Sequence, residues 1–104
     1  MAGLKWAVSV DLDGVLCEPG PIEQYGRARP IDKNIEKVNK LFALGFRIII
    51  HTARSWGSYD ITKTWLRNHK VEYTDLVMGK VLAEFYIDDH NSTLDAVLED
   101  PRCK

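Results

Sequence analysis

The sequence has few of the features that mark secreted, membrane-bound or disulfide-rich proteins. It contains only two cysteines, Cys17 and Cys103, which form neither a disulfide framework nor a spaced metal site. No apolar run approaches the roughly 20 residues that span a bilayer. The first residues also lack the charged-then-apolar layout of a signal peptide. We therefore expect a cytoplasmic protein that makes no contact with a membrane.

An excess of charge of one sign is also missing. The chain has 14 basic and 15 acidic residues, which gives a formal net charge of −1. This balance creates no overall field that attracts nucleic acid, so a nucleic-acid partner is disfavoured, although a local basic cluster could still bind an anion. The remaining composition, 45% hydrophobic and 28% charged, is that of an ordinary globular protein. A length of 104 residues suits one domain.

Short apolar runs alternate with segments of helical spacing along the chain. The runs are rich in β-branched residues and predict strands, the first of them buried on both faces. Ile61, Trp65 and Leu66 recur at helical spacing and are expected to face the core. Strands that alternate with helices predict a parallel sheet and a three-layer α/β/α sandwich in a single domain, residues 1–104. The expected strands are 6–10, 46–51, 76–78 and 85–87, and the expected helices are 31–44, 59–69 and 92–99.

Polar side chains follow the predicted strands at the point where each strand ends. In an open parallel sheet, ligands bind outside the carboxyl ends of the strands. Residues that are far apart in the sequence are therefore expected to meet in one cleft. The residues at these four ends are, in strand order, Asp11 and Asp13, Thr52 and Arg54, Lys80, and Asp88 and Asp89.

These motifs resemble those of the haloacid dehalogenase (HAD) superfamily. The segment Asp11-Leu12-Asp13-Gly14-Val15 is similar to the DxDG(T/V) signature, and the apolar run closed by Thr52 resembles the second motif. Lys80 matches the basic third motif, and Asp88-Asp89 matches the acidic fourth. The four motifs occur in the family's order between about residues 6 and 98. The resemblance implies a Rossmann-like sheet of the HAD type.

The resemblance also implies a phosphatase mechanism that makes physical sense for these residues. Asp11 would attack phosphorus and form an aspartyl-phosphate, which divides one difficult step into two. Asp13 would protonate the leaving oxygen and then deprotonate the water that hydrolyses the intermediate. Thr52 would hold a phosphoryl oxygen, and Lys80 would neutralise the nucleophile and the phosphate. These four residues are the expected catalytic set.

The cofactor implied by the resemblance is Mg²⁺, which prefers oxygen ligands and keeps several waters. The acidic pairs could instead cap turns at strand ends, where aspartate is common. Two facing pairs of carboxylates would be costly without a cation, however, and this favours the metal site. The implied ligands are Asp11, Asp13, and a carboxylate from Asp88 or Asp89.

Substrate contacts are expected in the loops around these strand ends. Gly14, Ala53 and Arg54 are assigned to substrate binding, and a surface salt bridge is an equal alternative for Arg54. The segment 14–30 has room for a flap only, so the protein resembles a member without a cap domain. A cap domain would close one side of the active site. A second copy of the chain could close that side instead, which is a hypothesis. The roles of Tyr25, Arg27, Trp56 and Tyr59 stay open.

The substrate expected for this site is a small phosphorylated metabolite such as a sugar phosphate or a nucleotide. A polynucleotide 3′-phosphatase is the competing enzyme. A phospho-acceptor domain of the response-regulator kind shares the fold and an acidic cluster, but its motifs come in a different order. A noncatalytic domain of the same fold is the last alternative, disfavoured because every reacting group is present.

Overall fold

The computed structural model of this chain describes residues 6–80, 99 and 101. The three strands and two α-helices expected within 6–80 are confirmed, each to within one residue at either end. The expected strand 85–87, the helix 92–99, and the acidic residues Asp88 and Asp89 lie outside the described residues. The elements in chain order are β1 (Ala7–Val10), η1 (Ile22–Arg27), α1 (Asp32–Ala43), β2 (Arg47–His51), η2 (Trp56–Ser58), α2 (Tyr59–Asn68) and β3 (Asp75–Val77).

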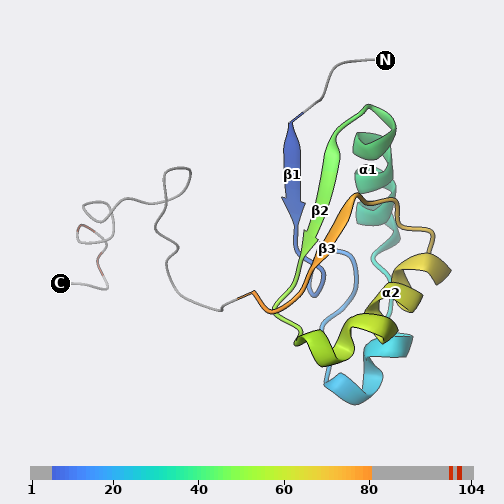
Figure 1. Cartoon of the computed structure of the whole chain (residues 1–104), viewed down its shortest axis with the longest axis vertical. Coiled ribbons are helices and arrows are strands. Elements are labelled where there is room, and N and C mark those ends of the chain that lie inside the picture. Colours follow the sequence, from blue (N-terminus) through green and yellow to red (C-terminus); the bar gives the residue numbers. More distant parts are fainter. Residues whose placement is uncertain (1–5, 81–98, 100, 102–104) are drawn as a thin grey trace.

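The three strands form one parallel sheet in the order β1-β2-β3, with the α-helices beside it (Figure 1). In this register Val10 of β1 lies opposite Ile50 of β2, and Ile50 lies opposite Leu76 of β3. Parallel strands need crossover connections, and here each crossover carries an α-helix. The described residues therefore have an α/β fold. Among them, no helix has both the length and the apolar character needed to cross a bilayer.

One face of β2 carries the core. Ile48 and Ile50, two residues apart, are both fully buried, and Ile49 between them is half-buried. The helices supply the opposing apolar side chains to the same cluster: Ile35 and Val38 from α1, and Trp65 and Leu66 from α2. These helices cover the sheet face that carries Ile48 and Ile50.

Two expectations about burial were wrong. In β1, Ala7 and Ser9 are exposed, because no described element covers the sheet face that they share. Ile61 of α2 is 43% exposed and turns away from the core. A Cβ added to Gly26 would lie 3.0 Å from Ile61 Cδ1, so Ile61 packs against the segment between β1 and α1 instead. Helical periodicity shows that an apolar residue at the edge of the buried face packs against something, but it does not show which part of the fold that is.

Residues 14–30 form an ordered flap whose two ends are joined. Glu18 N–H donates to the carbonyl oxygen of Arg29 at 2.9 Å, and Ile31 N–H donates to that of Leu16 at 2.8 Å. The Trp65 indole N–H reaches the carbonyl oxygen of Ala28 at 2.9 Å and fastens the flap to α2. The helical turn η1 lies against α2 (Figure 1). The part of the flap between the paired residues Glu18 and Arg29 has the size and closed ends of a compact surface loop.

Candidate functional site

The end of β1 turns sharply and presents two carboxylates. The Leu12 carbonyl oxygen accepts N–H groups from Val15, Leu16 and Cys17 at 3.2, 2.8 and 3.2 Å. Gly14 has φ +88°, a backbone conformation that side chains with a Cβ rarely adopt, so this turn favours glycine. Leu12 is 1% exposed and anchors the turn in the core. Asp11 and Asp13 on either side of it are left exposed and half-exposed, respectively.

The segments that follow β2 and β3 are joined to each other by backbone hydrogen bonds. Thr52 N–H donates to the Val77 carbonyl oxygen at 2.9 Å, and Lys80 N–H donates to the Thr52 carbonyl oxygen at 2.9 Å. Gly79, at φ +79°, allows the turn that brings the chain to Lys80. Lys80 Nζ then lies 3.6 Å from Asp11 Oδ1. The expected ammonium is thus beside the expected nucleophile.

Four of the predicted site residues line one cavity. This cavity of about 270 Å³ is bounded by Asp11, Asp13, Thr52 and Ala53, with Pro19 and Gly20 of the flap on its other side. Thr52 is buried, and its Oγ1 accepts the Arg54 N–H at 3.2 Å. The topology therefore brings the ends of β1 and β2 together, as the sequence predicted.

Arg54 does not extend into solvent. Its side chain is 2% exposed, and its guanidinium binds the Asp13 carboxylate with two hydrogen bonds. Nε donates to Asp13 Oδ2 at 3.0 Å, and Nη2 donates to Asp13 Oδ1 at 2.8 Å. The surface salt bridge considered for Arg54 is wrong in this respect, because the pair is largely buried. Its assignment to substrate binding stays a prediction.

Three further side chains enclose the Arg54 guanidinium. Arg54 Nη1 donates to Thr62 Oγ1 at 3.1 Å, and the Tyr25 ring centroid lies 3.7 Å from Arg54 Cζ. Cys17 Sγ lies 3.7 Å from Arg54 Nη2. Sequence reasoning missed Thr62, although a signal was present. This hydroxyl precedes Trp65 and Leu66 by three and four residues, and so lies on the buried face of α2.

Cys17 is fully buried beside the acidic turn. The pKa of its thiol is raised from 9.0 to about 12, chiefly by burial and also by the neighbouring Asp13 carboxylate, while Arg54 opposes both effects. The thiol donates to Asp13 Oδ1 at 3.5 Å. A thiol with this pKa stays protonated at neutral pH and is no nucleophile. The expectation that Cys17 is a packing residue agrees with this environment.

The donors at the cavity suit a hard divalent cation. Asp11 and Asp13 offer carboxylate oxygens and Thr52 offers a hydroxyl, the kinds of ligand that Mg²⁺ accepts. Within the described residues no group of three acidic, histidine or cysteine side chains surrounds a common point. The other two predicted ligands, Asp88 and Asp89, lie outside the described part of the chain, so the complete ligand set stays a prediction.

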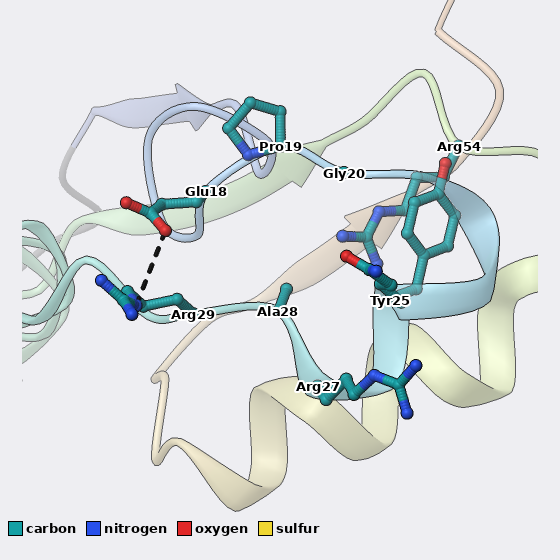
Figure 2. Close-up of a pocket in the computed structure, with 9 residues that line it drawn as sticks. Glu18, Pro19, Gly20, Tyr25, Arg27, Ala28, Arg29 and Arg54 are labelled. Atoms are coloured by element: carbon teal, nitrogen blue, oxygen red, sulfur yellow. Dashed lines mark ion pairs between the residues drawn. The ribbon is translucent and has the colours of Figure 1, made fainter.

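A second cavity of about 190 Å³ lies within the flap, with Arg54 as its one described lining residue from outside the flap (Figure 2). The guanidinium of Arg54 and the ring of Tyr25 lie at one end of it, and the Glu18–Arg29 ion pair lies at the other. Pro19 and Gly20 line both this cavity and the one at Asp11. The two cavities are therefore neighbours. The remaining lining residues are Gln24, Arg27 and Ala28.

The fold is shared with known structures, although no family model and no curated protein matches this sequence. A crystal structure of a protein from Vibrio cholerae matches with 29% identity and a TM-score of 0.68. The match covers 92% of this chain and 89% of that one. Two structures of a Pnkp1/Rnl/Hen1 complex, one described as an RNA repair complex, match with 19% identity and a TM-score of 0.66. They cover 97% and 83% of this chain, which spans only 36% and 29% of theirs.

Proposed function

We propose that this chain is a Mg²⁺-dependent phosphomonoester hydrolase of the HAD type that acts through an aspartyl-phosphate on Asp11. The observation that carries the proposal is the common cavity of Asp11, Asp13 and Thr52, with Lys80 Nζ 3.6 Å from Asp11 Oδ1. These groups are a nucleophile, an acid–base group, a hydroxyl donor and a cation, and their sequence motifs have the HAD order. The finer architecture in this proposal is a three-layer sandwich without a cap domain.

In the first step, an Asp11 carboxylate oxygen forms a bond to phosphorus and the bond to the leaving oxygen breaks. Asp13 gives its proton to that leaving oxygen. Lys80 lies beside the attacking carboxylate and offsets the negative charge that gathers there. The hydroxyl of Thr52 is available to donate to a phosphoryl oxygen.

In the second step, water attacks phosphorus, Asp13 takes the water proton, and the bond between Asp11 and phosphorus breaks. Inorganic phosphate and a free Asp11 carboxylate result. A bound Mg²⁺ supplies charge neutralisation between the anionic nucleophile and the anionic phosphate. Asp11 and Asp13, with Asp88 or Asp89, are the residues that would hold it.

The neighbouring cavities support a small substrate. We assign the phosphate group to the cavity of about 270 Å³ at Asp11, and the leaving group to the cavity of about 190 Å³ within the flap. The second cavity is lined by hydrogen-bonding and charged side chains, among them Gln24, Tyr25 and Arg27, and Glu18, its one acidic residue among those described, is paired with Arg29. Such a lining suits a hydroxyl-rich or anionic leaving group, as in a sugar phosphate or a nucleotide. A cytoplasmic location is part of the proposal.

The competing function is a polynucleotide 3′-phosphatase. It is favoured by the likeness to structures of a complex described as an RNA repair complex. At 19% identity that likeness concerns the fold alone. The net charge of −1 gives no general attraction for a nucleic acid.

The test is phosphate release by the purified full chain with Mg²⁺ from sugar phosphates, nucleoside monophosphates and a 3′-phosphorylated oligonucleotide. We expect many turnovers per enzyme on small substrates and none with Asp11→Asn. Asp75→Asn, which changes an aspartate at the opposite end of the sheet, is the matched control and should stay active. A phospho-acceptor domain would retain one phosphate per chain, and preference for the oligonucleotide would establish the competing function. Failure of the wild type on every substrate would refute the proposal.

A further inference from the structure

The Arg54 guanidinium is held by several residues of this chain. Each of its three nitrogens donates to a described side chain, namely to Asp13, Thr62 or Cys17. The Tyr25 ring covers one face of the guanidinium at 3.7 Å, a cation–π contact. With its side chain 2% exposed, Arg54 already spends most of its hydrogen-bond donors within the chain, which leaves little of the guanidinium for a substrate phosphate.

The contacts around Asp13 fix the orientation of its carboxyl group. Arg54 Nε, Arg54 Nη2 and the Cys17 thiol all donate to its two oxygens. Three donors on two oxygens leave the carboxyl group little freedom to rotate. In the proposed mechanism, the step in which Asp13 takes a proton is the attack of water on the aspartyl-phosphate.

The groups that hold Arg54 come from separate parts of the fold. Thr62 belongs to α2, Cys17 and Tyr25 belong to the flap, and Asp13 follows β1. Thr62 and Cys17 are completely buried, so the helix and the flap fix the guanidinium within the packed interior. A planar guanidinium that binds both carboxylate oxygens also sets the plane of the carboxylate.

We propose that Arg54 is a positioning residue that orients the Asp13 carboxylate for water activation, in place of a ligand for the substrate phosphate. The inference rests on the proposed function, because it concerns the residue assigned there as the base. In the step concerned, water forms a bond to phosphorus, its proton passes to Asp13, and the Asp11–phosphorus bond breaks. Arg54 exchanges no proton and keeps the accepting oxygen directed at the water.

The test uses 4-nitrophenyl phosphate, because nitrophenolate leaves without the help of an acid. The Arg54→Lys variant keeps the charge but loses the fork that binds both carboxylate oxygens. We expect it to release about one nitrophenolate per enzyme quickly, and then to turn over on the order of 10–100-fold more slowly than wild type. The value of kcat/KM, which reports the first step, should stay within about threefold of wild type. Inhibition by inorganic phosphate should be unchanged.

A phosphate ligand would behave differently. If Arg54 binds the phosphate, Arg54→Lys lowers kcat/KM together with kcat, shows no burst, and weakens inhibition by inorganic phosphate. That result overturns the inference. It leaves the proposed function intact, which fails only if the wild type does not turn over or if Asp11→Asn is as active as the wild type.

Thr62 provides a second test if Arg54→Lys folds poorly. Thr62→Val keeps the shape and removes the oxygen that accepts from Arg54 Nη1, so it should show the same burst with a smaller loss of kcat. Thr62→Ser keeps the hydroxyl and should recover most of the rate. Arg47→Lys, at an exposed arginine–aspartate pair, is the matched control and should behave as wild type. Wild-type kinetics in Thr62→Val would overturn the inference.

Discussion

Two arginine–aspartate pairs at opposite ends of the sheet show what burial does to the same chemistry. Arg47 Nη2 lies 3.3 Å from Asp75 Oδ2, and these side chains are 49% and 51% exposed. Arg54 Nη2 lies 2.8 Å from Asp13 Oδ1, and there the exposed fractions are 2% and 29%. Solvent and side-chain entropy weaken an exposed pair, whereas a buried guanidinium that loses its partner is left uncompensated. The exposed Arg47–Asp75 pair is therefore expected to add little to stability. The buried Arg54–Asp13 pair determines the geometry of a candidate site.

The largest difference between the two ends is expected in catalysis. Asp11→Asn at the carboxyl end should lower kcat by at least about 10³-fold, because the amide is a poor nucleophile. Asp75→Asn at the amino end should change kcat by less than about twofold, since it touches an exposed pair only. Steady-state phosphate release measures both, and circular dichroism verifies that each variant is folded. Retained hydrolysis in Asp11→Asn would assign the nucleophile to another residue.

Metal removal should also act on the carboxyl end alone. EDTA should abolish phosphate release, and excess Mg²⁺ should restore it, because Asp11 and Asp13 need a cation to accept an anionic substrate. Independently of activity, Mg²⁺ should raise the Tm of the wild type and of Asp75→Asn, since a ligand that binds only the folded state stabilises it. Asp11→Asn should show a smaller rise. Full activity in EDTA would remove the metal from the mechanism.

The two pairs should differ in stability as well. Asp13→Asn leaves the Arg54 charge buried without its carboxylate, and should lower the free energy of unfolding by about 2–3 kcal/mol. This is below the cost for a fully buried pair, because Asp13 is partly exposed. Asp75→Asn should cost less than about 1 kcal/mol. Urea denaturation at neutral pH measures both values, and equal costs would contradict the distinction drawn between the pairs.

The smallest effect concerns pH and arises from the thiol beside the buried pair. The pKa of Cys17 is about 12 when folded and near its ordinary 9.0 when unfolded. The folded state therefore binds the thiol proton more tightly than the unfolded state does. The contribution of this proton to the free energy of unfolding is complete below pH 9 and is lost as the pH rises towards 12. Cys17→Ala should remove this dependence, so the difference in unfolding free energy from wild type should shrink by about 1 kcal/mol per pH unit above 9. Urea denaturation at pH 8 and pH 10 tests this, and a constant difference would refute it.

Much of the described fold follows from local pattern. The β-branched run before His51 and the helical spacing of Ile35, Val38 and Leu41 predicted β2 and α1 to within a residue. These patterns are reliable because each segment buries one apolar face, whatever neighbour covers that face. Which neighbour covers that face depends on tertiary packing. For this reason the expectations for Ile61 and for the second face of β1 were wrong.

The candidate site divides in the same way. Asp11, Asp13 and Thr52 could be found because the carboxyl ends of parallel strands meet at one edge, so position in the chain is enough to place them together. The same rule placed Arg54 in the cleft with Asp13, but it could not say that the two side chains pair. Asp13 is 41 residues away from it, and Thr62 is on a helix whose rotation about its axis is set by packing.

The sequence by itself determined which residues form strands and helices and which polar groups follow them, because hydrophobic periodicity and turn residues act over a few neighbours. Only the tertiary structure decided that Arg54 lies against Asp13 under Tyr25, with Thr62 behind it. That choice depends on how the flap and α2 pack together. Burial favours the packing in which the guanidinium nitrogens find acceptors.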